Sequence, residues 1–390
     1  MSMQLVTGNH AAGHSMGLAG EANRGARGAV CGIYPITPQT EIVEYIAKFP
    51  FTRGSVVPVE SEHSAMGVCL GASMNGARSF TASSSNGLAY MAENVMVAAF
   101  YRLPIVMAVV NRTLGPPWNI WADQGDSLMF RDFAWVQLYC DTSQDVSDTT
   151  LLAFRIAEDP RILLPVMVCM DGFIISHTSM EVELAEQEQV DRFLPSCDVP
   201  HRLDSSHPAT MGGMTFPPET LAHRLEMYQA MKRVPEVLEE HRVQFRQEFG
   251  REVAGAVSAY QVEDADILFI TSGSISTTMK DVIDKRRERG EKVGMVRIKM
   301  FRPFPVEQVR ELCSGAKKVG VLDRNCAADR GGIFWQEVCA AMQGPGHPMI
   351  QGYLTGVGGS DVLPKTVHEV VDDLLERTEA GEPVWKGIEQ

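Results

Sequence analysis

The sequence predicts an α/β protein with parallel sheets that are covered by helices on both faces. Strand-like and helix-like segments alternate along residues 28–180, as they do in repeated strand–helix–strand units. Residues 105–110 are continuously apolar and mostly β-branched, which is typical of a strand buried on both faces. The alternation restarts after residue 255. We therefore expect a second, smaller domain of the same class.

The first domain is expected to open with a short strand at residues 29–34 and a helix at 40–49, where apolar residues recur at helical spacing. Residues 61–77 are rich in Ala, Gly and Met and predict a closely packed, buried helix. The remaining elements predicted here are a strand at 79–82, a turn at 83–87, a helix at 88–100, and strands at 105–110 and 164–170.

The middle of the chain has a different composition. Residues 198–218 are rich in Pro, His, Ser and Gly and indicate a connector, and residues 218–249 predict a charged amphipathic helix that we interpret as a solvated arm. The second domain is predicted from strands at 267–271, 293–298 and 318–322, a helix at 277–289 and a loop at 301–305. The expected division is 1–190, 191–254 and 255–390.

Composition excludes some functions. The chain has 390 residues and a formal net charge of -14, so it is a poor candidate for binding nucleic acid, which depends on basic surface. The first twenty residues have no basic region followed by an apolar stretch, as a signal peptide would. The most apolar stretch, 95–110, is interrupted by Arg102 and Pro104 and is too short to cross a membrane. We expect a cytoplasmic protein.

The eight cysteines are dispersed, and none forms a Cys-x-x-Cys pair. In a chain of this length they indicate buried thiols in a reducing compartment rather than disulfides or a metal site. No iron–sulfur motif is recognisable. His63 has no histidine four residues later, so we do not interpret it as a metal ligand.

Polar groups follow four of the predicted strands, in residues 34–38, 60–63, 83–87 and 111–112. In open α/β sheets, ligands bind in the crevice beyond the carboxyl ends of the strands. These segments supply hydroxyls, a carboxylate and a guanidinium. Such a set suits a small acid together with a cofactor that needs proton transfer.

Each segment also has a simpler interpretation. Thr37 can cap the following helix, and Glu62 can be an ordinary acid in the first turn of a helix. Arg112 can pair with a surface acid, and residues 83–87 can form an ordinary turn. From the residues alone, the prediction stops at an α/β enzyme with an anionic substrate.

Seven stretches, taken in order, carry a resemblance to a known family. They are 34–39 (YPITPQ), 59–66 (VESEHSAM), 80–88 (FTASSSNGL), 103–112 (LPIVMAVVNR), 119–123 (NIWAD), 296–305 (VRIKMFRPFP) and 321–324 (VLDR). Together they resemble the alpha subunit of the pyruvate:ferredoxin oxidoreductase family, over about residues 5–375. The ordered combination is far more specific than any single stretch.

The resemblance implies a fold, and it implies which subunits hold the cofactor and the clusters. The first domain is similar to the pyrimidine-binding domain of thiamine-dependent enzymes, and the second to the transketolase C-terminal domain. It implies that a beta subunit holds the diphosphate of thiamine diphosphate and its Mg²⁺; this chain has no Gly-Asp-Gly followed by a suitable Asn. It also implies a gamma subunit, a ferredoxin-like delta subunit, and [4Fe-4S] clusters on partner subunits only.

The resemblance further implies site residues. Glu62 matches the family glutamate that hydrogen-bonds the aminopyrimidine ring, Arg112 the arginine that grips the substrate carboxylate, and Thr37 a threonine that contacts the substrate. Further cofactor-binding residues are expected at Pro35, Ile36, Ser85 and Asn86.

The implied reaction is the oxidative decarboxylation of pyruvate to acetyl-CoA and carbon dioxide, or its reverse, in anaerobic metabolism, with coenzyme A and ferredoxin as partners. His10 and Trp118 depart from the commoner pattern, which leaves a branched-chain or aromatic 2-oxoacid as the alternative substrate. Thr37 disfavours an oxalate enzyme, which would need a further cation there. Two other hypotheses are a non-catalytic scaffold subunit and a non-redox, transketolase-like thiamine enzyme.

Overall fold

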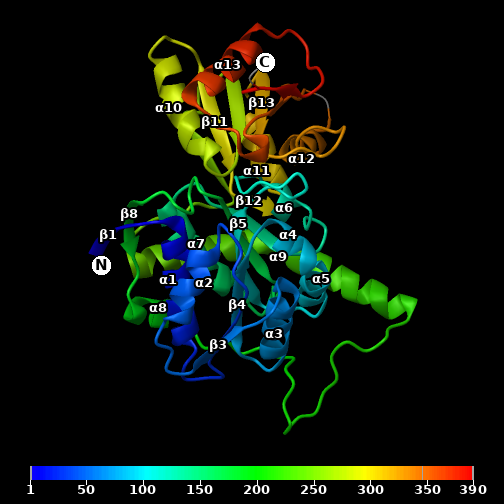
Figure 1. The fold of residues 1–390 in the computed structure, drawn as a ribbon. Helices are drawn as coiled ribbons and strands as arrows, with labels where there is room; N and C mark the ends of the chain where they lie inside the picture. Colours follow the sequence, from blue (N-terminus) through cyan, green and yellow to red (C-terminus); the bar gives the residue numbers. More distant parts are fainter. Residues whose placement is uncertain (1, 345, 389–390) are drawn as a thin grey trace.

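The computed structural model describes residues 2–344 and 346–388, which fold into two stacked lobes (Figure 1). The first lobe, blue to green in Figure 1, forms around a seven-stranded sheet, and the second lobe, yellow to red, forms around a six-stranded sheet. Helices cover both sheets. The predicted α/β class is therefore confirmed.

The seven-stranded sheet has the strand order β12-β6-β7-β5-β4-β2-β3. Neighbouring strands are parallel except β12, which is antiparallel to β6. The strands are β2 (Ala29–Ile33), β3 (Gly54–Pro58), β4 (Arg78–Ser83), β5 (Ile105–Asn111), β6 (Val136–Tyr139), β7 (Val166–Asp171) and β12 (Met300–Arg302).

Helices bury both faces of this sheet, as β5 shows. Val106, Ala108 and Val110 belong to one apolar cluster, and Ile105, Met107 and Val109 belong to another, because successive strand residues point to opposite faces. The first cluster includes residues of α1 (Gly8–Ala22), α2 (Thr40–Ala47), α7 (Ser143–Ala157) and α8 (Gln187–Phe193). The second includes residues of α3 (Glu62–Met74), α4 (Ser85–Tyr90), α5 (Ala92–Phe100) and α6 (Gly125–Leu128).

The second lobe has the strand order β15-β14-β13-β10-β11-β9. Its strands are β9 (Val257–Tyr260), β10 (Ile267–Thr271), β11 (Val293–Ile298), β13 (Lys318–Asp323), β14 (Met349–Leu354) and β15 (Val384–Trp385). Its helices are α10 (Ile275–Arg287), α11 (Val306–Cys313), α12 (Ile333–Ala341), η1 (Val357–Gly359) and α13 (Pro364–Glu376). The strands predicted at 267–271 and 293–298 are confirmed.

Three local predictions were wrong. Residues 83–87 are not a turn, because α4 begins at Ser85, and the helix predicted at 88–100 is divided at Met91 into α4 and α5. The segment predicted as a loop at 301–305 begins inside β12, which pairs with β6 of the first lobe. The start of α4 and the pairing of β12 depend on partners distant in the sequence: the Ser85 N–H at the start of α4 donates to Asp126, and β12 pairs with the free edge of β6.

The long helix α9 (Pro217–Phe249) is a solvated arm over only part of its length. Its N-terminal turns project beyond the body (Figure 1) and expose Leu221 and Leu225, whereas Met227 and Ala230 are already buried. Its C-terminal half buries Val234, Leu238 and Phe245 in the same apolar cluster as α7 and α8. The arm interpretation is therefore corrected for the second half.

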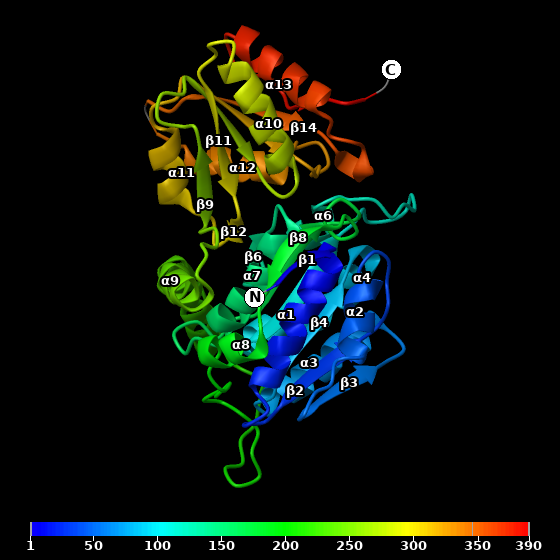
Figure 2. The same cartoon turned by 90° about the vertical axis from the view of Figure 1, so that its left-hand side faces the viewer.

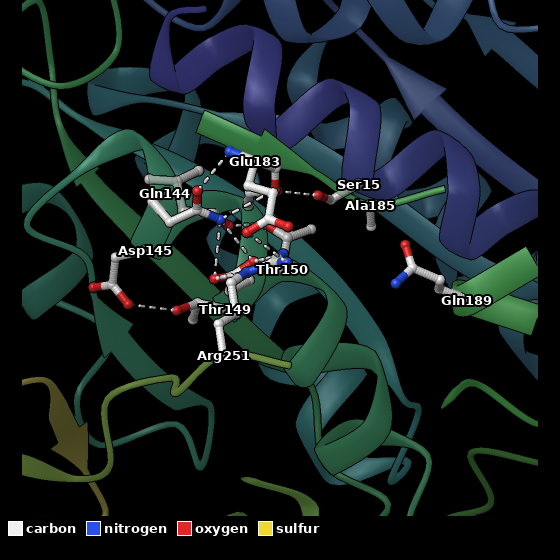
Figure 3. Close-up of polar contacts among 12 residues, drawn as sticks. Ser15, Gln144, Asp145, Thr149, Thr150, Glu183, Ala185, Gln189 and Arg251 are labelled. Carbon is white, nitrogen blue, oxygen red and sulfur yellow. Dashed lines mark hydrogen bonds and ion pairs between the residues drawn. The ribbon is translucent and has the colours of Figure 1, made fainter. Parts of the chain in front are cut away.

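A two-stranded sheet was not predicted at all. β1 (Ser2–Val6) pairs antiparallel with β8 (Met180–Leu184), which is remote in the sequence. The Gln144 side chain of α7 supports β8: the Glu183 N–H donates to Gln144 Oε1 at 2.7 Å, and Gln144 Nε2 donates to the Glu183 carbonyl at 3.3 Å (Figure 3).

A buried ion cluster joins the lobes near β12, which lies between them (Figure 2). Asp145 of α7 accepts a hydrogen bond from Lys299 Nζ at 2.7 Å and another from Arg297 Nη2. Arg297 also pairs with Asp141, with 3.0 Å between Nη1 and Oδ2. Burial alone would raise the pKa of Asp145, but the charges of Lys299 and Arg297 outweigh burial and hold that pKa below its usual range.

Within residues 2–344 and 346–388, no helix is both long enough and apolar enough to span a bilayer.

Candidate functional site

Four polar segments converge at one edge of the seven-stranded sheet. Strands β5, β4, β2 and β3 are adjacent and parallel, so their carboxyl ends share an edge. The four polar segments that contain the predicted site residues all lie at or just after those ends. The sequence argument that placed them in one crevice agrees with the sheet order.

Arg112 reaches from the end of β5 to the loop that follows β2. Its Nη1 donates to the Thr37 carbonyl at 2.8 Å, and its Nε donates to the Asn119 carbonyl at 2.9 Å. Among the described residues, no carboxylate lies within salt-bridge distance of its guanidinium. The alternative of a surface ion pair was therefore wrong. Burial lowers the pKa of Arg112, and the nearby Asp126 opposes that shift.

Thr37 lies beside Arg112 and is exposed, as is Pro35, while Ile36 is half-buried. The capping alternative for Thr37 was wrong, because α2 begins at Thr40 and is preceded by Gln39. The three residues thus line the open side of the edge, next to a guanidinium that has no acidic partner.

Glu62 is the first residue of α3, where Ser61 caps the helix by accepting from the Ser64 N–H. The simpler interpretation, an acid in the first turn, is correct for its position. Its side chain is nevertheless only 8% exposed. A Cβ placed on Gly87 would lie 2.7 Å from Glu62 Oε1 and 2.7 Å from Ser83 Oγ. The carboxylate therefore packs against bare backbone at the start of α4.

Ser83 adds an unsatisfied group to this place. Its buried hydroxyl has no hydrogen-bond partner among the described residues, and buried polar atoms usually have one. A buried carboxylate beside an unpartnered hydroxyl fits a ligand that carries ring nitrogens and an amino group. The residues present are therefore compatible with the aminopyrimidine ring that the resemblance implies.

Ser85 and Asn86 hold the loop after β5. Ser85 has a left-handed backbone (φ 51°), which is uncommon outside glycine, and its hydroxyl donates to the Thr113 carbonyl. Asn86 bonds Gly115 twice, with Oδ1 accepting from the N–H at 2.9 Å and Nδ2 donating to the carbonyl at 3.1 Å. These two side chains join the ends of β4 and β5.

Sequence reasoning missed Asp126, which lies beneath this edge and is fully buried. One oxygen accepts from the Ser85 N–H at 2.8 Å and the Arg112 N–H at 3.0 Å. The other accepts from Asn111 Nδ2 at 2.7 Å and the Ser127 N–H at 2.8 Å. Burial raises the pKa of Asp126 to about 7 against the effect of these donors. No local pattern marks a carboxylate whose four donors come mostly from other elements.

Trp118 does not pack in the interior. It is 70% exposed, and its ring covers Gly115, where an added Cβ would come within 2.4 Å of it. Most of the Trp118 ring is therefore in contact with solvent, so packing in the interior does not account for it.

No cluster of three His, Cys, Asp or Glu side chains in the described residues is arranged to hold a metal ion, and His63 lies 3.9 Å from Glu93. All eight cysteines are free thiols. Six are buried as expected, but Cys326 is exposed and Cys339 is half-buried.

Two family models match the chain. Residues 21–242 match the model described as pyruvate flavodoxin/ferredoxin oxidoreductase, thiamine diphosphate-binding, and residues 265–367 match the pyruvate:ferredoxin oxidoreductase core domain II. The first model alone covers more than half of the chain.

Curated relatives match nearly end to end. The pyruvate synthase subunit PorA of Methanothermobacter thermautotrophicus is 40% identical and covers 100% of this chain and 99% of its own length. The Thermotoga maritima PorA is 43% identical over 89% of both chains. The ketoisovalerate oxidoreductase subunit VorA of Pyrococcus horikoshii is 39% identical over 97% of this chain and 95% of its own.

Solved structures share the fold. A 2-oxoglutarate:ferredoxin oxidoreductase from Magnetococcus marinus superposes with a TM-score of 0.74 at 20% identity over 96% of this chain, which spans 65% of that longer chain. A split-gene transketolase superposes with a TM-score of 0.55 at 13% identity over 96% of this chain. Both lobes are therefore included in each superposition.

Proposed function

The chain belongs to the pyruvate:ferredoxin oxidoreductase family, and we propose that it is the alpha subunit of a 2-oxoacid:ferredoxin oxidoreductase to whose active site it contributes Glu62, Arg112 and Thr37. The observation that carries this proposal is the shared edge. Glu62 follows β3, and its buried carboxylate packs against Gly87, which follows β4. Arg112, whose guanidinium has no acidic partner among the described residues, follows β5, the strand beside β4 in the same sheet.

Each residue has a role that its surroundings support. Arg112 would receive the substrate carboxylate, since a guanidinium fork pairs with a carboxylate in two parallel hydrogen bonds. The exposed Thr37 would contact the same substrate. Glu62 would hold a proton shared with the aminopyrimidine ring, and Pro35, Ile36, Ser85 and Asn86 would shape the surrounding wall. When bound, thiamine diphosphate supplies the nucleophilic carbon that attacks the 2-oxo group.

The proposed reaction converts a 2-oxoacid and coenzyme A into an acyl-CoA, carbon dioxide, a proton and two electrons. The carbon–carbon bond to the carboxylate breaks and the thioester bond forms. The electrons would leave one at a time through [4Fe-4S] clusters to ferredoxin. We assign those clusters to partner subunits, the diphosphate and Mg²⁺ to a beta subunit, and further contacts to gamma and ferredoxin-like delta subunits.

Pyruvate is the proposed substrate. Relatives named for pyruvate and for ketoisovalerate are similarly close to this chain, at 40% and 39% identity, so a branched 2-oxoacid stays the alternative. The free thiols support a reducing compartment, and we propose the cytoplasm.

In the deciding experiment, the native complex is purified without oxygen. Reduction of a low-potential dye is then followed in the presence of a 2-oxoacid and coenzyme A. Glu62→Gln keeps the size of the side chain but removes its charge and proton, so we expect kcat to fall by about 100-fold or more while the subunits still assemble. Glu93→Gln, at an exposed carboxylate near His63, is the matched control and should leave kcat unchanged.

The other outcomes identify the competing hypotheses. Full activity of Glu62→Gln would contradict the assignment of Glu62 to the active site and would favour a scaffold subunit. A complex that lacks iron and reduces no dye with any 2-oxoacid would favour a transketolase-like carbon transferase, because that reaction releases no electrons. The best acid among pyruvate, 2-oxoglutarate, 2-oxoisovalerate and phenylglyoxylate identifies the substrate.

A further inference from the structure

One loop of the second lobe contacts the segment that carries Arg112. We call residues 112–123 the strap and residues 355–360, which follow β14, the glycine loop. Asn119 Nδ2 of the strap donates to the Gly358 carbonyl at 2.9 Å, and the Gly358 N–H donates to Asp123 Oδ2 at 2.9 Å. A single residue of the second lobe thus uses both of its backbone polar groups on the strap.

Glycine is required in that loop. Gly356, Gly358 and Gly359 all have left-handed backbones, with φ of 70°, 67° and 88°, which side chains disfavour. A Cβ on Gly359 would lie 2.0 Å from the Cβ of Trp121. The close approach of the loop to the strap therefore needs glycine at 359, and the left-handed backbone favours glycine at 356 and 358.

Asn119 connects the glycine loop to Arg112. Its side chain bonds Gly358 and also accepts from the Trp121 N–H at 2.9 Å. Its carbonyl accepts from Arg112 Nε at 2.9 Å, and Arg112 Nη1 is held by the Thr37 carbonyl. The guanidinium is thus tied on two sides, and one of these ties passes through a residue anchored on the second lobe.

We propose that Asn119 is a positioning residue through which the glycine loop of the second lobe orients the Arg112 guanidinium toward the substrate carboxylate. This inference rests on the proposed function and gives the second lobe a part in substrate binding. A free arginine side chain samples many rotamers, and fixing it before the substrate arrives lowers the entropic cost of binding. Loss of the anchor should therefore weaken substrate binding more than it slows the chemistry.

The experiment compares Asn119→Ala with Asn75→Ala in the purified native complex. Asn75 is a matched control because its side-chain amide also donates to a backbone carbonyl, that of Gly71 at 2.7 Å, but at the end of α3. We expect Asn119→Ala to raise the KM for the 2-oxoacid by about 10- to 100-fold, with kcat changed less than about threefold and the KM for coenzyme A unchanged. Asn75→Ala should leave all three values unchanged.

Two further measurements distinguish failure of this inference from failure of the proposed function. Hydrogen exchange of the peptide spanning residues 112–124 should quicken in Asn119→Ala whether or not the complex is active. In an Arg112→Lys background, the effect of Asn119→Ala on KM should largely disappear, because both changes act through one guanidinium. A loosened strap with an unchanged KM overturns the inference, as does unchanged exchange. A wild-type complex that reduces no dye with any 2-oxoacid overturns the proposed function instead.

Discussion

At the residue scale, Asp126 shows how a buried carboxylate can organise a site without touching its ligand. It accepts two backbone N–H groups from the ends of neighbouring strands, those of Ser85 and Arg112. Burial disfavours the charged carboxylate, and the donors favour it; the balance raises its pKa to about 7. The positions of Ser85 and Arg112 are therefore linked to one titratable group.

The sign of this pKa shift gives a pH dependence. Because the pKa is raised from 3.8 to about 7, the folded chain holds a proton on Asp126 at pH values below 7 at which the unfolded chain has released it. The stability contributed by this group is present at low pH and is lost as pH rises through 7. Protonation, however, removes the negative charge of the carboxylate and so weakens the hydrogen bonds that it accepts from the Ser85 and Arg112 N–H groups.

We predict that the KM for the 2-oxoacid rises as pH falls below about 7, since a protonated Asp126 holds Arg112 less firmly. Asp126→Asn should show the high KM at every pH between 5.5 and 8.5. Asp323→Asn is a suitable control, because burial also raises the pKa of Asp323 to about 7, but its carboxylate caps α12. A pH profile that is unaltered in Asp126→Asn would contradict the prediction.

At the element scale, the start of α4 is packed against the start of α3. Gly87 lies where any side chain would meet Glu62 Oε1, so the glycine is needed for close approach rather than for a special backbone angle. The distance between two helix ends therefore sets the position of the proposed proton-holding carboxylate.

Gly87→Ala should lower kcat/KM by about 10- to 100-fold, because the added methyl group displaces the Glu62 carboxylate. Gly71→Ala in the middle of α3 is the control, since a Cβ there meets nothing within 4 Å. That substitution should stabilise the helix by about 0.5–1 kcal/mol without changing activity. Steady-state kinetics and thermal unfolding of the complex distinguish the two; equal kinetics for both variants would exclude this role for Gly87.

At the scale of the whole molecule, the two lobes are joined by buried charge as well as by β12. Asp145 of α7 faces Arg297 and Lys299 from the end of β11, and all three are buried. A buried ion pair contributes little net stability compared with apolar packing, but removal of one member leaves the others uncompensated. The cluster therefore penalises separation of the lobes.

Asp145→Ala should destabilise the protein by about 3–5 kcal/mol, seen as a lower midpoint of thermal unfolding of the complex. Glu240→Ala removes an exposed partner of Arg161 and should change the midpoint little, because water and salt screen surface pairs. Similar midpoints for the two variants would mean that the Asp145 cluster does not hold the lobes together.

Local patterns in the sequence were enough to predict the fold class and the strands at 267–271 and 293–298, because hydrophobic periodicity is a local signal. They also placed Thr37, Glu62 and Arg112 after strand ends, but the strand order that brings those ends to one edge is a property of the tertiary structure. It did not reveal β1, β12 or the buried half of α9, which exist only through partners far along the chain. Asp126 and Asn119 belong to that second group. Their roles depend on donors and acceptors that only the tertiary structure brings within hydrogen-bond distance.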